Sequence, residues 1–438
     1  MIFHVASLGC ARNLVDSESM TGRLIAAGHE TTEDPGGAEV IVVNTCSFIE
    51  SAINESIDTI LALARHKTHG VCRRLIVTGC LPERFREAIV GSLPEVDMFL
   101  GTGAYDMIVE VLVDHGHRSR CILPDPDAPA STAAILPKAG RSSPMSYLKI
   151  AEGCDRHCTY CIIPKLRGRQ KSRPMAGIVR EAAALVQAGA KELVLVAQET
   201  SAYGTDIGLH NGLAQLLQQL SALSADIWIR VLYGHPDSMS DTLIRTMHEA
   251  DNICSYFDIP IQHASNRILK KMGRQYRKED LFRLFDRIRS LAGDACLRTT
   301  VITGFPGETE TDFEDLFHCI EKIQFDHLGV FNYSDSEDLA SHGLGHHVPG
   351  DVAAARHDAI MLRQRELSEG NNEKYLHQTL PVLIEEAPEK GLYIGRTVFQ
   401  APEVDGITYV RNDELTIGDF VNVRISDTLE YDLTGEAS

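Results

Sequence analysis

Residues 1–120 alternate short apolar runs with longer stretches whose hydrophobic positions recur at helical spacing. Three of the apolar runs, FHVASLGC, VIVVNTCSF and LIVTGC, have the length and the β-branched content of buried strands. Strands that alternate with helices are typical of a parallel sheet with crossover helices. The pattern therefore predicts an α/β fold, with a doubly wound parallel sheet in an N-terminal domain of residues 1–120.

A second β/α series occupies residues 146–375. Helical stretches such as GIVREAAALVQAG and ETDFEDLFHCIEKI separate six strand candidates. The candidates cover residues 146–151, 192–198, 227–233, 256–261, 297–303 and 327–333. Six β/α units are fewer than the eight that close a full barrel, so we predict an open, partial (β/α)6 barrel. Its active site should lie at the carboxyl ends of the strands.

A proline-rich segment, residues 121–145, separates the two series. A segment so rich in Pro, Ala and Ser does not hold regular structure, and we predict an interdomain linker here. Its prolines are Pro124, Pro126, Pro129, Pro137 and Pro144.

The pattern changes again in residues 376–438, after a polar helical stretch at 351–375. The runs PVLIEEA, GLYIGRTV, ITYV and DFVNVRISDT are separated by turns that contain Gly and Asp. This pattern predicts a small antiparallel β-barrel. The segment holds twelve acidic and four basic residues, whereas an RNA-binding barrel is normally basic.

The composition narrows the class of protein. Hydrophobic residues make up 44% of the chain and charged residues 24%, which is typical of a globular protein. No apolar run reaches the roughly 18 residues that span a bilayer, and the first residues lack the features of a secretory signal. We therefore expect a cytoplasmic protein without a membrane partner. The net charge of −19 favours a basic partner and argues against direct RNA binding.

Eleven cysteines are many for a cytoplasmic chain, and an odd number does not complete a disulfide framework. Metal ligation or redox chemistry explains these cysteines better than a disulfide framework does. Cys10, Cys46 and Cys80 lie at or near the ends of the three N-terminal strand candidates, roughly 35 residues apart. Because ligands of open α/β sheets bind beyond the carboxyl ends of the strands, these three side chains can converge in space.

Cys154, Cys158 and Cys161 form a C-x3-C-x2-C motif directly after the first strand candidate of the partial barrel. Thiolates are soft ligands that suit iron–sulfur clusters and zinc. A zinc site would need a fourth ligand, for which His157 is the nearest candidate. A thioredoxin-like pair would use only Cys158 and Cys161 and leave Cys154 without a role. A four-iron cluster held by three thiolates would keep one iron free of protein ligands.

The C-x3-C-x2-C motif at the mouth of a six-unit β/α barrel resembles the radical S-adenosylmethionine (SAM) superfamily. The resemblance implies a [4Fe–4S] cluster whose free iron is chelated by the amino and carboxylate groups of SAM. It also implies reductive cleavage of SAM to a radical that abstracts a hydrogen atom from a C–H bond.

The resemblance implies further contacts with SAM. Gln198, in VAQET, corresponds to the strand end where the superfamily places polar contacts to the SAM amino group. Tyr160 resembles the position that packs on adenine. Ile302 and Gly304, in TTVITGFPGE, resemble a strand that lets adenosine approach the backbone.

Cys10, Cys46 and Cys80, followed by GCDRHCTYCIIPKLRGR and by a barrel of the type called TRAM, resemble the methylthiotransferase family over nearly the entire chain. The resemblance implies that these three cysteines hold an auxiliary [4Fe–4S] cluster. It implies two SAM molecules, one a methyl donor and one a radical source, and no catalytic residues beyond the cluster ligands. An electron donor such as flavodoxin or ferredoxin is a further implied partner.

Members of this family modify either an adenosine beside the tRNA anticodon or an aspartate of a small-subunit ribosomal protein. The acidic last barrel suits a basic ribosomal protein, and APEVDGITYV with GDFVNVRISDTLEYDLTGE resembles the aspartate-modifying subfamily. We therefore expect a ribosomal-protein aspartate as the substrate. The alternatives are a tRNA adenosine, a non-catalytic iron–sulfur carrier and a zinc-dependent RNA-binding protein.

The chain departs from the subfamily at one place. The subfamily usually has a Ser-Pro-x-x-Gly-Thr stretch after the sixth strand, whereas this chain has YSDSEDLASHGLGHHVPG. The departure leaves the cluster ligands unchanged. We expect the acidic run 335–338 to be a solvated loop.

Overall fold

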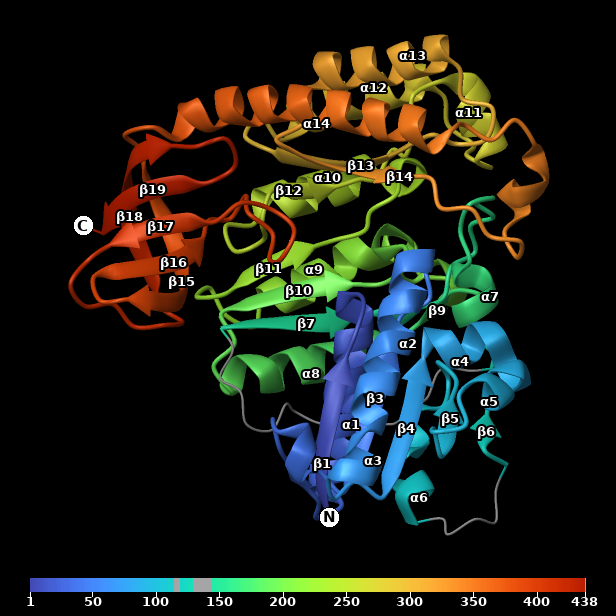
Figure 1. The fold of residues 1–438 in the computed structure, drawn as a ribbon. Helices are drawn as coiled ribbons and strands as arrows, with labels where there is room; N and C mark the ends of the chain where they lie inside the picture. The colour runs from blue at the N-terminus through green and yellow to red at the C-terminus, as the bar shows by residue number, and fades with distance from the viewer. Residues whose placement is uncertain (114–118, 129–143, 438) are drawn as a thin grey trace.

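The computed structural model describes residues 1–113, 119–128 and 144–437. Its N-terminal domain contains a sheet of six parallel strands in the order β2-β1-β3-β4-β5-β6 (Figure 1). The strands are β1 (Ile2–Ser7), β2 (Glu30–Thr31), β3 (Val40–Thr45), β4 (Arg74–Gly79), β5 (Met98–Leu100) and β6 (Cys121–Ile122). The predicted parallel sheet is confirmed.

Helices cover both faces of this sheet because alternate residues of each strand point to opposite sides. In β3, Val40 and Val42 pack with Leu24 of one helix, whereas Ile41 and Val43 belong to the opposite core. The six helices are α1 (Ala11–Ala26), α2 (Glu50–Ala64), α3 (His66–His69), α4 (Cys80–Phe85), α5 (Ile89–Ser92) and α6 (Ile108–Val113). The sheet is therefore doubly wound, as predicted.

The predicted linker, residues 121–145, falls largely outside the described residues. Residues 129–143 are among those that the structure does not describe. The first two residues of the predicted linker form β6, the edge strand of the N-terminal sheet.

The central domain holds the six predicted strands in two parallel sheets, β11-β10-β7 and β12-β13-β14. The strands are β7 (Met145–Lys149), β10 (Glu192–Val196), β11 (Trp228–Val231), β12 (Tyr256–Asp258), β13 (Cys296–Thr303) and β14 (His327–Asn332). Ile229 joins the two sheets, because its N–H donates to the Asn252 carbonyl at 2.8 Å and its carbonyl accepts from Cys254 at 2.9 Å. The open, partial barrel is confirmed.

Helices surround the outer face of the partial barrel (Figure 1). A short hairpin of β8 (Ala151–Glu152) and β9 (Lys171–Ser172) follows β7. The helices are α7 (Ile163–Arg167), α8 (Met175–Gln187), α9 (Gly212–Ser221), α10 (Asp241–Glu249), α11 (Asn266–Lys271), α12 (Lys278–Leu291), α13 (Glu310–Ile323) and the long α14 (Gly350–Asn372). None of the helices in the described ranges is long and apolar enough to cross a membrane.

The C-terminal domain is a closed five-stranded barrel in the order β15-β16-β17-β19-β18. Its strands are β15 (Thr379–Glu389), β16 (Leu392–Arg396), β17 (Thr408–Arg411), β18 (Phe420–Thr428) and β19 (Leu433–Ala437). The barrel is antiparallel except where β17 pairs with β19 in parallel, which differs from the uniformly antiparallel prediction. The pattern did not reveal β19, because LTGEA is short and carries a glycine at its centre.

This barrel packs against the amino ends of the central strands, on the side from which the arrows of β7 and β10 start (Figure 1). Glu192 at the start of β10 is fully buried, and it accepts hydrogen bonds from Arg230 at 2.7 Å and from Arg396 of the C-terminal barrel at 2.5 Å. The carboxyl ends of the strands, where the site is expected, remain at the opposite end.

Candidate functional site

The loop that carries Cys154, Cys158 and Cys161 begins at a glycine that the backbone requires. Gly153 has φ +80°, and a Cβ atom there would lie 2.0 Å from the Arg169 carbonyl oxygen. Only glycine allows both this conformation and this close approach. The loop therefore starts in close contact with the backbone of Gly168 and Arg169, which precede β9.

The other side of this cysteine loop rests on the end of α11. Thr159 donates its N–H to the Met272 carbonyl at 3.1 Å and its hydroxyl to the Lys271 carbonyl at 2.8 Å. The Thr159 carbonyl accepts from the Ser341 N–H at 2.9 Å. Three separate segments thus hold the loop at the carboxyl ends of the barrel strands, and a preorganised backbone suits a ligand loop.

A cavity of about 270 Å³ opens at this loop. Cys154, Cys158 and Cys161 all line it, and so do Tyr160 and Gln198. The further lining residues are Arg12, Phe48, Arg156, Ile163, Glu199, Tyr233, Gly234, His235, Asp258, Pro260, Gln262, Arg274, Arg298, Thr300 and Phe331. The structure therefore brings five of the predicted site residues together around one space.

The two remaining predicted SAM contacts, Ile302 and Gly304, do not line this cavity. Ile302 packs with Tyr160 and Phe305 in a small apolar cluster. Gly304 has φ +74°, and a Cβ there would lie 2.5 Å from the Cβ of Ala353 in α14. Packing of the strand end against α14 is thus a sufficient reason for glycine at this position.

Burial raises the pKa of the Cys154 thiol to about 11 and that of Cys161 to about 12. Metal ligands must be thiolates, so metal binding at this loop releases protons.

The N-terminal cysteines lie at the turns after β1, β3 and β4. Cys10 precedes α1, Cys46 follows β3 and Cys80 is the first residue of α4. A Cβ on Gly9, which has φ +89°, would lie 2.7 Å from the Cβ of Cys46, so the first two turns touch. The predicted juxtaposition of the strand ends is thus present.

Two guanidinium groups face these N-terminal thiols. Arg167 Nη2 lies 3.7 Å from the Cys80 sulfur. Burial alone would raise the pKa of the Cys10 thiol, but the charges of Arg12 and Arg167 lower it below the ordinary value. These cations stabilise a thiolate, which is the form that ligates metals.

A buried polar network connects the two sets of cysteines. Besides approaching Cys80, Arg167 donates to Asp16 at 2.9 Å and to Glu152 at 3.0 Å. Glu152 also accepts from Gln198 Nε2 at 2.7 Å, which leaves the buried Gln198 Oε1 without a hydrogen-bond partner among the described residues. A buried acceptor without a partner indicates room for a donor group in the cavity. The sequence reasoning missed Arg167, whose only signal was its place in GCDRHCTYCIIPKLRGR.

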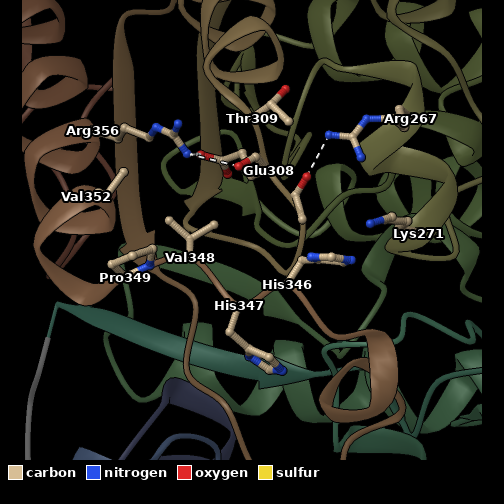
Figure 2. A pocket seen from close by; sticks show the side chains of 11 residues that line it. Arg267, Lys271, Glu308, Thr309, His346, His347, Val348, Pro349, Val352 and Arg356 are labelled. Atoms are coloured by element: carbon tan, nitrogen blue, oxygen red, sulfur yellow. Dashed lines mark hydrogen bonds and ion pairs between the residues drawn. The ribbon is translucent and has the colours of Figure 1, made fainter.

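A second cavity, of about 510 Å³, lies behind the carboxyl end of β13 (Figure 2). Arg356 pairs with Glu308 at 2.8 Å on one side, and Arg267 donates to the Gly307 carbonyl at 2.6 Å on the other. His346 lies between them on the loop that follows η7, the 3-10 helix Ala340–Leu344. None of the predicted site residues lines this space.

The acidic run 335–338 is largely exposed to solvent, but two of its carboxylates have partners within the protein. Asp338 accepts from Arg84 Nη2 at 2.6 Å, and the Arg84 side chain is only 4% exposed. Asp335 accepts from the hydroxyl of Tyr333 and pairs with His342, each at 2.9 Å. The sequence did not indicate these ion pairs, because Arg84 comes from a distant part of the chain.

The two cysteine sets have the chemistry of iron–sulfur ligands: six free thiols in two groups of three, backed by cations. Within the described ranges, no three histidine, cysteine or acidic side chains surround a site for a single metal ion. The five remaining cysteines are free thiols: Cys72, Cys254, Cys296 and Cys319 are buried, and Cys121 is partly buried.

Models of three protein families match the chain. The Uncharacterized protein family UPF0004 matches residues 2–101, the Radical SAM superfamily matches 148–320 and the TRAM domain matches 378–437. The partial barrel, with its three-cysteine loop at the carboxyl ends of the strands, thus defines a radical SAM enzyme, a class that uses an iron–sulfur cluster and SAM.

Curated relatives define the family more closely. The ribosomal protein uS12 methylthiotransferase RimO of Desulfosudis oleivorans is 56% identical over 439 residues, which cover 100% of both chains. The protein of that name from Clostridioides difficile is 46% identical, covering 98% of this chain and 97% of the relative. The chain belongs to the RimO family of radical SAM methylthiotransferases.

Solved structures share the fold at low identity. The radical SAM methyltransferase TsrM from Kitasatospora setae, with tryptophan substrate and a SAM analogue bound, has a TM-score of 0.56 at 14% identity, covering 75% of this chain and 72% of that chain. The cobalamin-dependent SAM radical enzyme OxsB has a TM-score of 0.50 at 13% identity, covering 84% and 56%.

Proposed function

We propose that the protein inserts a methylthio group at a C–H bond of an aspartate in the small-subunit ribosomal protein uS12. The proposal rests on the activity named for relatives that are 43% to 56% identical over 98% to 100% of this chain. In this proposal, the reaction uses two SAM molecules and two [4Fe–4S] clusters, with one cluster at each set of three cysteines. The reaction takes place in the cytoplasm, where ribosomal proteins are made.

One observation of the structure supports this proposal: the cavity at Cys154, Cys158 and Cys161 also reaches residues that lie close in sequence to two of the N-terminal cysteines. Cys154, Cys158 and Cys161 line one wall. Arg12 and Phe48, each two residues beyond a cysteine of the other set, line the same space. A group transfer that needs a radical source and a sulfur source benefits from such proximity.

When bound, the clusters would supply the electron for SAM cleavage and the sulfur that is transferred. The chain's own residues bind and orient the reactants. Gln198 is held by Glu152 and offers its free Oε1 to an ammonium group, such as that of SAM. Arg274 donates to the Tyr160 hydroxyl at 2.5 Å, which orients that ring beside Cys161. Ile302 packs beside Tyr160 and Phe305 on this wall, whereas Gly304, two residues further on, packs against Ala353 of α14.

Two aromatic side chains favour a protein loop as the substrate. Phe48 and Phe331 both line the cavity, and they are 43% and 57% exposed. Large exposed rings beside a cavity are typical of sites that bind a partner chain. The net charge of −19 attracts a basic protein and repels the phosphates of RNA.

Mass spectrometry of cells that lack their own enzyme of this kind tests the proposal. Expression of this chain should add the mass of a methylthio group to uS12, and a Cys154→Ala, Cys158→Ala, Cys161→Ala variant should not. Bulk tRNA from the same cells should be unchanged. A methylthio group found on tRNA adenosine, with uS12 unmodified, would replace the proposed substrate by the tRNA alternative.

An electron donor is the remaining partner in the proposal. Flavodoxin or ferredoxin would reduce the cluster at Cys154, Cys158 and Cys161. Photoreduced flavodoxin should support SAM cleavage by the reconstituted wild-type protein, measured as 5′-deoxyadenosine. If neither donor supports cleavage while dithionite does, another reductant serves this enzyme.

A further inference from the structure

Four arginine side chains line the main cavity, and their partners differ. Arg156 makes a two-pronged pair with Glu199, with N–O distances of 2.7 and 2.8 Å. Arg298 donates to Asp258 at 2.9 Å and pairs with Asp405 at 3.3 Å. The charges of these two guanidinium groups are therefore neutralised within the protein.

Arg274 and Arg12 are different, because the structure records no carboxylate within 4 Å of either in the described ranges. Arg274 lies against Tyr160 and Tyr276 on the wall that carries the three-cysteine loop. Its neighbour Gly273 approaches Cys158 so closely that an added Cβ would lie 3.6 Å from the Cα of Cys158. The Arg274 cation therefore belongs to the SAM side of the cavity.

Arg12 enters the cavity from the N-terminal domain. Its Nη1 donates to the Ala197 carbonyl at 3.0 Å, and its guanidinium carbon lies 4.6 Å from the centre of the Tyr233 ring. The ring face, the carbonyl and the Cys10 side chain, with which Arg12 also forms a hydrogen bond, fix the orientation of the guanidinium and leave further N–H groups for a ligand.

The Tyr233 residue, on whose ring Arg12 lies, has a strained backbone conformation. Tyr233 has φ +63°, a left-handed conformation that is uncommon for a residue with a bulky side chain. Its N–H donates to the Asp258 carboxylate at 2.8 Å. Asp258 is the partner of Arg298, which in turn reaches Asp405 of the C-terminal barrel. A strained residue held by buried charges is typical of a ligand site.

We propose that Arg12 binds the side-chain carboxylate of the target aspartate and so selects an acidic residue as substrate. This inference rests on the proposed function. Arg12 is half-buried, and apart from the Cys10 side chain the structure records no acidic partner for it in the described ranges, so an incoming carboxylate can form charge-assisted hydrogen bonds with its remaining N–H groups. Asparagine and the neutral adenine base carry no charge, so neither can form these charge-assisted hydrogen bonds with Arg12.

Two peptides of the uS12 target loop test this inference, one with the target aspartate and one with asparagine in its place. Affinities of the reconstituted wild-type, Arg12→Gln, Arg12→Lys and Phe48→Ala proteins are measured by titration calorimetry. Hydrogen bonds to charged groups contribute about 1.5–3 kcal/mol, so wild-type protein should prefer aspartate by about 10- to 150-fold. Arg12→Gln should lose most of this preference and Arg12→Lys should retain part of it. Phe48→Ala should weaken both peptides equally.

Each other outcome overturns the inference in a recognisable way. If Arg12→Gln weakens SAM binding instead, the carboxylate that Arg12 meets is that of SAM. If Arg12→Gln loses iron, or weakens both peptides equally, Arg12 holds the Cys10 turn and does not select the substrate. If wild-type protein binds neither peptide and modifies tRNA, the proposed function itself has failed.

Discussion

Arg84 and Asp338 lie 254 residues apart in the chain and form an ion pair with 2.9 and 2.6 Å hydrogen bonds. Arg84 belongs to α4, which begins at Cys80, and it also donates to the carbonyl of Ser47, the residue after Cys46. Asp338 belongs to the loop after β14, whose Ser341 holds the radical SAM cysteine loop. The pair therefore joins the turns of both cysteine sets.

Loss of this pair should destabilise the protein in a pH-dependent manner. Burial raises the pKa of Asp338, but hydrogen bonds from Arg84 and Ser336 outweigh it and lower the pKa to about 2. Because the folded-state pKa lies below the unfolded value of about 3.9, the stabilisation is full above pH 4 and falls between pH 4 and 2. Asp338→Asn should cost about 2 kcal/mol at pH 7 in urea unfolding and less at pH 3.

Lys165→Gln is the matched control for this pair. Lys165 lies 3.7 Å from the same carboxylate, but its side chain is 57% exposed. Its loss should cost less than about 1 kcal/mol. Equal costs for the two variants at every pH would contradict the assignment of the stabilisation to Arg84.

The buried carboxylate of Glu192 should be needed to attach the C-terminal barrel. It pairs with Arg230 and Arg396, and none of the three side chains is more than 2% exposed. Breaking a buried pair by removing one partner costs about 3–5 kcal/mol, so Glu192→Gln should destabilise strongly. Limited proteolysis should then release the C-terminal barrel. Glu385→Gln, at the 21% exposed edge of the network, should cost less, and similar losses in both variants would argue against a role for burial.

Gly304→Ala separates packing from SAM binding. The added Cβ would lie 2.5 Å from that of Ala353 and take a left-handed φ, so thermal unfolding should show a loss of about 2–4 kcal/mol. Adding Ala353→Gly should recover the part due to the clash. If the double variant regains stability but still binds SAM weakly, Gly304 serves the adenosine as the family resemblance implies. Normal SAM affinity would leave packing as its only role.

The two cysteine sets should hold iron independently. Substituting Cys10, Cys46 and Cys80 with alanine should leave about half of the reconstituted iron and preserve SAM cleavage. Substituting the three cysteines of the other loop should leave a similar amount of iron but abolish cleavage. Cys72→Ala, which alters a buried thiol outside both sets, should change neither measurement. Loss of all iron from either triple variant would mean that the two sites assemble together.

The sequence by itself determined the order of the three domains and the parallel character of the first two, and it singled out the six cysteines that we propose as cluster ligands. It could do so because strand and helix periods, turn residues and cysteine spacings are local properties of the chain. The convergence of Cys10, Cys46 and Cys80 could also be predicted, because the topology of a parallel sheet brings the carboxyl ends of its strands to one edge.

Only the tertiary structure decided which charges meet. The sequence did not assign a role to Arg12 or to Arg167, yet Arg12 lines the cavity and Arg167 lies 3.7 Å from the Cys80 sulfur. The sequence predicts Asp338 as part of a solvated loop, and only the structure shows that Arg84 lies beside it. The physical reason is that the stability of a buried charge depends on its partners and its solvent, and both come from segments that are hundreds of residues apart.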